Sequence, residues 1–271
     1  MNSDYLDRFA GIGRLYGTDA LEKFHTAHVA VVGLGGVGSW VVEALARSGI
    51  GELTLIDLDE ICVSNTNRQM HAVSSNLGAS KVQTMADRAR DINPDLIIHE
   101  HECFATQDNL EDLLVEPIDY VVDAIDSAGV KAAMISHCRR RKIPIVTTGG
   151  AGGLIDPLKI EVADLSKTQH DALAAKVRSI LKRHFGFSRS GKRFGVECVF
   201  SLEQARYPQL DGSVCATKNF GESDVRLDCS GGLGAVTSVT AAFANIAVSR
   251  VLIKMSERVT RERKQADQSR V

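Results

Sequence analysis

A cluster of polar side chains follows the second buried segment of the chain, in the stretch "DLDEICVSNTNRQ". An acidic residue that ends a strand soon after a glycine-rich turn, as Asp57 does, usually anchors the ribose of a dinucleotide. A nicotinamide site has no obvious use for the Asn65, Asn67 and Gln69 amides or for the Arg68 guanidinium. Amides can orient phosphate oxygens, and arginine is a permanently charged fork of donors that matches a phosphate. The stretch therefore predicts a site that stabilises charge on a reacting phosphate.

The glycine-rich turn "GLGGVG" lies between a predicted strand and a predicted helix. Gly33 permits the tight turn, Gly35 lets backbone approach a phosphate, and Gly38 lets the helix pack closely, with Gly36 part of the same cofactor-binding turn. The helix N-terminus adds free N–H groups and a partial positive charge. Alone, this pattern is shared by many nucleotide-binding families, and together with Asp57 it serves NAD and ATP equally well.

Three further residues complete a set suited to nucleotidyl transfer. Lys81 opens the helix after "GAS" and offers a mobile positive charge, although a lone lysine in a first helical turn usually faces solvent. Asp126, at the tip of the fourth predicted strand, is placed either to hold Mg²⁺ on a triphosphate or to cap the next helix. For Asp59 a ribose or metal role and a solvated turn aspartate are both open. Stabilising a pentavalent α-phosphate needs cations such as these, whereas hydride transfer does not.

The first half of the sequence alternates strand and helix patterns. A continuous apolar run that ends in glycines, typical of a strand buried on both faces, occurs in "HVAVVGLGG", and four further strands are predicted at "ELTLID", "LIIHEHE", "YVVDAID" and "PIVTTGGAG". Helical segments lie between them, with a glycine stop at Gly49 and a break before Pro94. This alternation predicts an α/β fold, a Rossmann-like doubly wound and mostly parallel sheet.

The second half has a different pattern. The runs "LKIEVADLS" and "GVECVFSLE" suggest antiparallel strands around one basic helix, "HDALAAKVRSILKRHF", and a long small-residue helix from Ser230 to about Glu257 closes the fold. We expect the polar tail "RERKQADQSRV" to be frayed. The chain is thus predicted to be a single domain over residues 1–271, with a C-terminal extension of mixed and antiparallel strands and helices. Residues 155–228 form a predicted substrate-facing insertion within it.

Composition excludes several classes of protein. The net charge of -2 over 271 residues gives no global attraction to nucleic acid or acidic membranes, so any basic surface must be local. The six cysteines include no C-x-x-C pair, which leaves a zinc knuckle unsupported. The polar N-terminal "MNSDYLDRFA" does not read as a signal peptide, and reduced thiols in a cytoplasm are the expectation.

The segment from Gly231 to Ser249 needs a membrane check, because it carries no charge and has about the length that spans a bilayer. It is rich in Gly, Ala, Ser and Thr, with Asn245 inside, so its hydropathy is weak on an insertion scale. We expect a helix packed tightly on the sheet rather than a membrane association.

The combined pattern "GLGGVGS…LIDLDEICVSNTNRQ…GASK…DAIDS" resembles the ubiquitin-activating-type (ThiF/MoeB-like) adenylating superfamily. Members activate a carboxylate as an acyl-adenylate with ATP and Mg²⁺. The resemblance implies that the turn glycines line the phosphates, that Asp57 binds the ribose and that Asp126 binds Mg²⁺. Arg14, in "GRLYG", matches an N-terminal arginine that reaches the partner subunit's site, which implies a homodimer. The residues that would act on the phosphates are Asn67, Arg68 and Lys81.

A closer resemblance, to the tRNA threonylcarbamoyladenosine dehydratase branch, extends over nearly the whole chain. It is carried by "RFAGIGRLYG", "VTTGGAGGLIDP", "VADLSKTQHDALAAKVR", "CVFSLEQARYPQ" and "DCSGGLGAVTS". The branch's substrate is the threonyl carboxylate of a modified adenosine beside the anticodon of certain tRNAs. The resemblance implies that ATP adenylates this carboxylate and that the neighbouring carbamoyl oxygen displaces AMP, closing an oxazolone-type ring with net loss of water. Intramolecular closure has a high effective molarity and needs no catalytic cysteine.

The span "KVRSILKRHFGFSRSGKR" is the candidate tRNA contact, because dense cations on one helix and loop can track phosphates with salt-sensitive affinity. A solvated helix face is the alternative. Phe185, Phe187 and Phe194 are placed either to stack on bases or to pack in the core. The cations of the span are Lys176, Arg178, Lys182, Arg183, Arg189, Lys192 and Arg193.

Other candidate residues are interpreted as structural. Cys198, Cys215 and Cys229 are taken as packing or incidental thiols. His99 and His101 are taken as the end of a strand, because two ligands at i and i+2 without a third partner make a weak metal site.

Three other functions stay open on the sequence. An enzyme that adenylates the C-terminal glycine of a ubiquitin-like sulfur carrier would share every ATP residue, but the missing C-x-x-C pairs and the basic span argue against it. A nucleotide-gated binding subunit would have a damaged site, yet Arg14, Arg68, Lys81 and Asp126 are all present. An NAD oxidoreductase leaves the Arg68 cluster unexplained. The resemblance also leaves open a bound monovalent cation and a cysteine-desulfurase or sulfur-acceptor system as partner.

Overall fold

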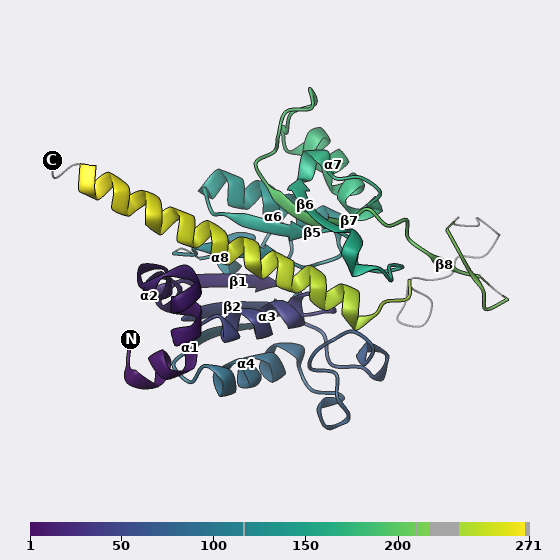
Figure 1. The fold of residues 1–271 in the computed structure, drawn as a ribbon. Helices are drawn as coiled ribbons and strands as arrows, with labels where there is room; N and C mark the ends of the chain where they lie inside the picture. The colour runs from purple at the N-terminus through teal and green to yellow at the C-terminus, as the bar shows by residue number, and fades with distance from the viewer. Residues whose placement is uncertain (116, 210, 217–232, 269–271) are drawn as a thin grey trace.

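A seven-stranded sheet runs through the centre of the computed structural model, which describes residues 1–115, 117–209, 211–216 and 233–268 (Figure 1). The strand order is β3-β2-β1-β4-β5-β7-β6, and every neighbouring pair is parallel except β6 with β7. This order, which reverses between β1 and β4, confirms the predicted doubly wound fold. The strands are β1 (His28–Val32), β2 (Glu52–Asp57), β3 (Ile97–Glu102), β4 (Tyr120–Asp123), β5 (Ile145–Thr148), β6 (Ile160–Asp164) and β7 (Glu197–Ser201).

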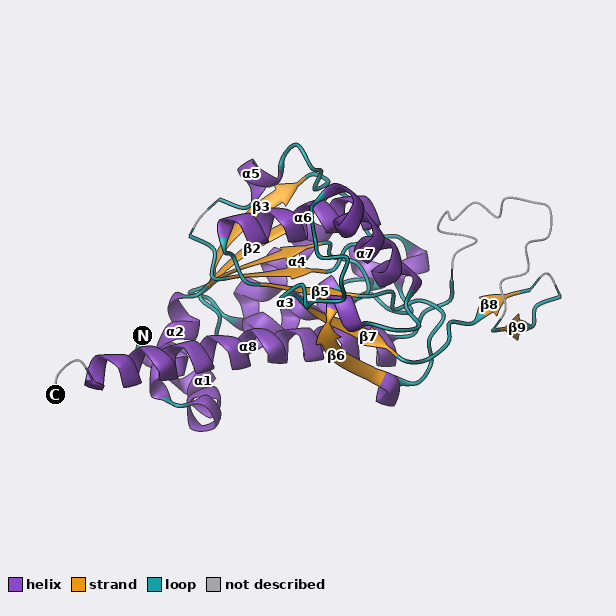
Figure 2. Ribbon diagram, turned by 90° about the horizontal axis from the view of Figure 1, so that it is seen from above, coloured by secondary structure: helices purple, strands orange, loops and turns teal. Residues whose placement is uncertain are grey.

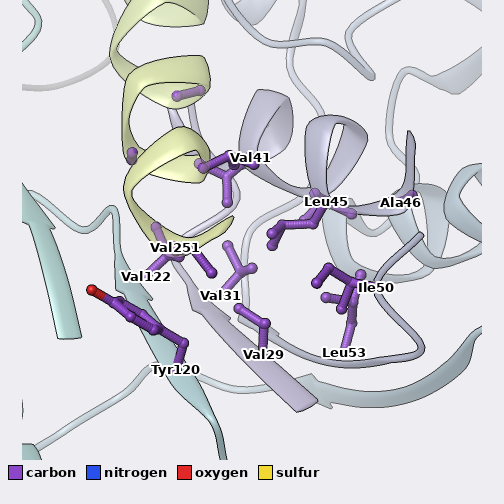
Figure 3. Close-up of a cluster of buried hydrophobic side chains, with 14 of the residues drawn as sticks. Val29, Val31, Val41, Leu45, Ala46, Ile50, Leu53, Tyr120, Val122 and Val251 are labelled. Carbon is purple, nitrogen blue, oxygen red and sulfur yellow. The ribbon is translucent and has the colours of Figure 1, made fainter. Parts of the chain in front are cut away.

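Helices cover both faces of the sheet, which creates two cores from alternate residues of each strand. Val29 and Val31 of β1 belong to the core beneath α3, α4 and α8, whereas Ala30 and Val32 belong to the core beneath α5, α6 and α7 (Figures 2 and 3). Central strands therefore read as unbroken apolar runs. The helices are α1 (Ser3–Tyr16), α2 (Thr18–Thr26), α3 (Gly38–Arg47), α4 (Lys81–Ile92), α5 (Leu110–Leu113), α6 (Ala128–Arg141), α7 (Ala172–His184) and α8 (Thr237–Gln268).

Local sequence signals set the helix ends near the site. The Ser80 hydroxyl caps α4 by accepting a hydrogen bond from the Gln83 backbone, and α4 ends before Pro94, as predicted. Gly49 follows α3 with a φ of +77°, where a Cβ would lie 2.6 Å from the Tyr5 hydroxyl. A glycine is therefore required at this stop both for its backbone conformation and for space.

Helix α8 differs from its prediction at its C-terminal end. It continues to Gln268, so the expectation of a frayed tail is wrong up to that residue. Ion pairs stabilise the extension: Arg258 bonds Glu262 at 2.9 Å one turn away, and Arg263 bonds Asp19 of α2 at 2.6 Å. The predicted start near Ser230 lies outside the described residues.

Within the described chain, α8 is the one helix whose length and composition would allow it to cross a membrane, over Thr237–Ala266 with a mean hydropathy of 1.3 in its most apolar window. Half of that window is buried inside the fold, where α8 packs against α2, α3 and β5. The expected packing of this segment on the sheet is confirmed for the residues that the structure describes.

The second half of the chain extends the main sheet. β6 and β7 are antiparallel to each other, as predicted, but β7 also pairs in parallel with β5. The small hairpin of β8 (Tyr207–Pro208) and β9 (Val214–Cys215) projects away from the body (Figure 2). The division into one domain with an insertion at residues 155–228 stays a prediction, and residues 210 and 217–228 of it lie outside the described chain. Short 3-10 helices occur at η1 (Val63–Asn65), η2 (Ser74–Asn76), η3 (Pro157–Lys159) and η4 (Leu165–Lys167).

Candidate nucleotide-binding site

The glycine-rich turn lies at the carboxyl ends of β1 and β4, where the strand order reverses. Gly33 has a φ of +86°, and its N–H donates to the Ile56 carbonyl at 2.9 Å. A Cβ on Gly38 would lie 1.7 Å from the Gly33 carbonyl oxygen, so the turn itself requires both glycines. A Cβ on Gly35 would have no neighbour nearer than 4.0 Å. Gly35 therefore leaves open space, which suits a ligand more than internal packing.

Asp57, the last residue of β2, holds this turn in place. Its Oδ2 accepts a hydrogen bond from the Leu34 backbone N–H at 2.6 Å, and its Oδ1 accepts one from the Asp59 backbone at 2.9 Å. The side chain is half-buried. Because each carboxylate oxygen has a second lone-pair direction, Asp57 can still accept hydrogen bonds from ribose hydroxyls.

Arg68 lies beside the turn and is fixed by its neighbours. Its Nη1 donates to the Ser64 carbonyl at 2.8 Å and to the Asn67 Oδ1 at 2.9 Å. Its aliphatic stem would lie 3.3 Å from a Cβ on Gly36, so the arginine passes directly over the turn. Among the described residues, its Nε and Nη2 donors make no hydrogen bond. Two donors of a held guanidinium are thus available to an anion at the turn.

The first turn of α8 closes one side of the site, which the sequence did not predict. Asn67 Nδ2 donates to the Ala235 carbonyl at 2.7 Å, and the Thr237 hydroxyl donates to the Asn67 carbonyl at 2.8 Å. Thr240 lies 3.3 Å from a Cβ on Gly36, and its hydroxyl bonds the Arg68 carbonyl at 3.3 Å. Helices α3 and α8 both begin next to the glycine-rich turn, so their N-termini add partial positive charge there.

Asn65 and Gln69 are more buried than a ligand-facing role suggests. The Asn65 Oδ1 accepts from the Cys62 backbone at 3.0 Å and closes the 3-10 turn η1. Gln69 is 7% exposed, and its Oε1 has no hydrogen-bond partner in the described chain. An unpaired buried acceptor costs free energy unless a ligand or water satisfies it. Gln69 is therefore the better ligand candidate of the two, since its amide lies beside Gly35.

Lys81 is buried rather than solvent-facing, although it opens α4. It is only 4% exposed, and its Nζ lies 2.7 Å from Oδ2 of Asp59. A buried ammonium needs a paired carboxylate, which explains why Asp59 points to it. Two of the three ammonium protons remain for other acceptors.

Asp126 is exposed in the loop after β4, two residues beyond Ala124, which packs against Gly33. The nearby Asp123 is fully buried and is already committed, with Oδ1 at 2.8 Å from the Lys131 ammonium and Oδ2 bonded to the Thr147 hydroxyl. Of these two carboxylates, that of Asp126 is therefore the one accessible to a hard cation such as Mg²⁺.

His71 belongs to the site and was missed by sequence reasoning. Its Nε2 lies 2.9 Å from the Leu34 carbonyl, opposite the bond from Asp57, so the turn is held from both sides. Burial lowers the pKa of His71, so the ring is neutral and donates from Nε2. Its Nδ1 is buried without a partner in the described chain. The signal was present, since His71 follows "NTNRQM", but a lone histidine there has no distinctive spacing.

Arg14 and the predicted tRNA span are not part of this edge. Arg14 is exposed in the last turn of α1. Other residues of α1 hydrogen-bond the carbonyl oxygens of Gly49 and Ile92, which lie at the C-terminal ends of α3 and α4, away from the nucleotide edge. Helix α7 begins at the site edge, where the Asp171 carboxylate accepts from the Gly150 backbone N–H. Near its other end, Lys182 lies over Phe194, three residues before β7 begins, and Arg193 lines a hollow with Ile145, the first residue of β5, so this part of the span lies toward the edge where the parallel strands begin.

Within the basic span the side chains divide by burial. Lys176, Arg183, Arg189, Lys192 and Arg193 are exposed. Arg178 is half-buried and bonds the Thr168 hydroxyl, and Lys182 is half-buried with its ammonium over the Phe194 ring. Phe187 and Phe194 are buried and in edge contact at 5.0 Å, so for these two the core alternative is confirmed.

Of the remaining thiols, Cys198 fits its structural interpretation. Cys198 is buried, and burial raises its thiol pKa, whereas Cys215 is half-exposed and Cys229 lies outside the described residues. His99 does have neighbours that the sequence did not predict: His28 and Glu52 place ligand atoms within 4.8 Å of it. Both ring nitrogens of His28 are already bonded, to Pro117 and Thr54, which favours a structural role.

The site combines the glycine-rich turn, an acid placed for a ribose, an arginine with free donors and an accessible carboxylate. Together these features define a nucleotide-binding protein of the adenylating type. A family model described as "ThiF family" matches residues 8–270, and the chain belongs to this family. Its similarity is to the tRNA threonylcarbamoyladenosine dehydratase of Escherichia coli K12, at 54% identity over 94% of this chain and 96% of that protein. The protein of the same name from Haemophilus influenzae is 48% identical, over 93% and 94% of the two chains.

A solved structure supports the same branch. The E. coli tRNA N6-threonylcarbamoyladenosine dehydratase in complex with ATP matches with a TM-score of 0.85 and 48% identity, covering 96% of this chain and 98% of that one. The resemblance stated from the sequence, to the dehydratase branch of the adenylating superfamily, is thereby confirmed.

Proposed function

We propose that this protein is an ATP-dependent, tRNA-modifying enzyme that dehydrates threonylcarbamoyladenosine. A threonyl carboxylate oxygen attacks the α-phosphorus of ATP, and diphosphate leaves. The carbamoyl oxygen then attacks the acyl carbon, AMP leaves with the transferred oxygen, and a five-membered ring closes. The net change in the nucleoside is the loss of one water. Similarity over nearly the full length of named dehydratases supports this substrate class.

The observation that carries the proposal is the open space at Gly35, next to Gly36, over which the stem of a fixed Arg68 passes. A phosphate on this turn would meet backbone N–H groups from below and two free arginine donors from the side. Such preorganised donors stabilise the charge that develops on a pentavalent phosphate. Lys81, held by Asp59, adds a second cation, and Asp57 is left for the ribose.

Mg²⁺ fits the donors at this edge. Asp126 offers an exposed carboxylate, and Mg²⁺ prefers one or two carboxylates together with phosphate oxygens. When bound, the ion would neutralise charge on the triphosphate, while Asp126 would hold it near the turn.

Arg14 supports a homodimer in which each subunit completes the other's site. Its place at the edge opposite its own nucleotide turn means that it can serve the reaction only in a partner. Mixing Arg14→Ala and Arg68→Ala variants tests this, because the hybrid dimer would contain one intact site. Random mixing of two inactive variants should restore about a quarter of wild-type activity. Mixtures as inactive as their components would count against the shared site.

The direct test is product analysis. Pure protein, ATP, Mg²⁺ and tRNA bearing threonylcarbamoyladenosine should yield a nucleoside lighter by one water in mass spectrometry. Arg68→Ala and Asp126→Ala should abolish this product while the circular dichroism spectrum and melting temperature stay close to wild type. Full turnover in both variants would refute the assigned roles.

The sulfur-carrier alternative has less support. It shares the ATP residues, but the sequence has no C-x-x-C pair. A carrier-activating enzyme would form an adenylate on a protein tail and release diphosphate without any tRNA. Tail-dependent exchange of labelled diphosphate into ATP would favour that reading over the one proposed.

A further inference from the structure

A hollow of about 650 Å³ lies at the edge of the sheet opposite the candidate nucleotide site. Tyr120, Ile145 and Val196, at or next to the first residues of β4, β5 and β7, form part of its lining. The C-terminal half of α8 forms one wall. This hollow takes no part in the nucleotide chemistry described above.

Cations outnumber carboxylates in the lining of the hollow. Six cationic side chains and three carboxylates line it, so the difference is 6 − 3 = 3 positive charges in excess. This is unusual for a chain whose net charge is -2. The carboxylates are Asp119, Asp164 and Glu197, and the cations are Lys23, Arg193, Arg250, Lys254, Arg258 and Arg261.

All three carboxylates are satisfied inside the protein. Asp119 bonds the Lys23 ammonium at 2.5 Å. Glu197 accepts two hydrogen bonds from the Arg250 guanidinium, at 2.9 and 3.0 Å. Asp164 accepts the backbone N–H groups of Phe194 and Gly195, which help to keep its pKa low despite burial. Lys23 and Arg250 are thereby neutralised, and the excess charge resides on the other four cations.

These four cations remain available to an anion. Among the described residues, Arg193 and Arg261 form no ion pair with an acid. Arg258 pairs only with Glu262, and its side chain is 59% exposed. Lys254 is 3.4 Å from Glu257 and 3.9 Å from Glu197, both loose contacts. Because positions 254, 258 and 261 are spaced by four and three residues, they share one face of α8.

Arg193 connects the hollow to the basic span of residues 176–193. It lines the hollow and belongs to the loop that carries Arg189 and Lys192, both exposed. Sequence reasoning found this span but missed the α8 cations. Their signal was present as basic residues at 250, 254, 258 and 261 of one helix.

We infer that this hollow binds the sugar–phosphate backbone of the substrate tRNA, an inference that rests on the proposed function. Arginines that no buried carboxylate neutralises are suited to phosphodiesters, and such contacts position an RNA without reading its sequence. Strands of five residues are about 17 Å long, and a folded tRNA is larger than that. One tRNA can therefore be held here while its modified nucleoside reacts at a nucleotide site. Arg14 lies at the same edge, so the hollow is on the side from which a partner's site would be completed.

The test is a triple variant, R193Q/R258Q/R261Q, in the full-length protein. The control is R8Q/R47Q/R90Q, which removes equal charge from exposed arginines of α1, α3 and α4 that do not line the hollow. Binding of labelled tRNA bearing threonylcarbamoyladenosine is measured from low to high salt, together with KM, kcat and ATP affinity.

We expect the triple variant to bind tRNA about tenfold or more weakly than the control, and the slope of log K against log salt to fall by about 2 to 3. KM for tRNA should rise while kcat and ATP affinity stay within about twofold of wild type. A Kd or a salt slope equal to that of the control would overturn the inference. So would loss of a wild-type dimer in the variant by sedimentation, because the hollow would then be an interface between copies. If the wild-type protein forms no dehydrated nucleoside, the proposed function itself is wrong. That assay is therefore done before any variant is compared.

Discussion

Two glycines of the same turn should respond oppositely to alanine. Gly38 is required by the turn's own packing, whereas Gly35 borders space that we assign to a phosphate. If this division is right, Gly38→Ala damages the fold and Gly35→Ala damages only ligand binding. The two substitutions add the same methyl group three residues apart, so each is the control for the other.

The magnitudes follow from the distances. A Cβ on Gly38 would lie 1.7 Å from the Gly33 oxygen, and contacts under 3.0 Å are not found, so the turn would have to open by 3.0 − 1.7 = 1.3 Å. Gly33 resists this movement because its N–H donates to the Ile56 carbonyl and because the Ala124 backbone would lie only 3.1 Å from a Cβ at Gly33, which leaves little free space beside it. We expect a loss of about 2–4 kcal/mol, or a melting temperature lower by about 5–15 °C.

Gly35→Ala should leave the fold intact. The new methyl group meets nothing nearer than the Gln69 Nε2 at 4.0 Å, and Gly35 has no positive φ, so the free energy of unfolding should change by about +0.4 to +1 kcal/mol through the unfolded chain. A phosphate placed against this backbone would meet the methyl group instead. Overpacking of about 1–3 kcal/mol corresponds to ATP affinity about 5- to 150-fold weaker.

Urea denaturation and calorimetric titration with ATP measure both effects on the same preparations. Our reasoning about the turn is refuted if Gly35→Ala binds ATP as tightly as wild type. It is also refuted if Gly38→Ala unfolds at the same urea concentration as Gly35→Ala.

Three further outcomes are expected. Lys81→Met should lower turnover at least about a hundredfold with a melting temperature within a few degrees of wild type, because it removes a buried cation that we assign to the phosphates and leaves Asp59 free to hydrate; unchanged turnover would contradict the proposed role of Lys81. Burial lowers the pKa of His71, so the unfolded chain binds a proton there more readily than the folded protein does, and the contribution of His71 to stability should be complete above about pH 6.5 and decline below it. Between pH 7.5 and 5, the urea midpoint of His71→Gln should therefore decline less steeply than that of wild type. An identical decline would exclude this histidine as a cause of the pH dependence. Iodoacetamide should modify exposed Cys62 in the native protein well before Cys198, whose thiol pKa burial raises, and mass spectrometry of peptides that showed Cys198 reacting first would disprove its burial.

The parallel core of the fold was predictable because its signals are local. Strand β2 was predicted with the observed bounds, Glu52 to Asp57, since a short and mostly apolar segment between a glycine and an acid leaves few alternatives. The joining of β7 to β5 was not predictable, because pairing partners depend on how the chain packs after the strands have formed. The persistence of α8 to Gln268 likewise depends on an ion pair with α2, 244 residues away in sequence.

For the candidate site, the sequence predicted residues that the structure places around the glycine-rich turn, but it did not predict their burial or their partners. It placed Arg68 and Lys81 near a phosphate, yet it gave Lys81 a solvent-facing alternative that the structure removes by burying it against Asp59. His71 was missed because its hydrogen bond to Leu34 crosses between two loops. The α8 contacts of Asn67 were missed because they join residues 168 positions apart.

By itself the sequence determined the strand–turn–helix unit, the acid after β2 and the class of chemistry, because these depend on backbone geometry and residue type over short spans. Only the tertiary structure decided which cations face the nucleotide edge and which face the opposite edge. Charge acts through distance in space, and spacing along the chain does not fix that distance until the sheet and its helices have assembled.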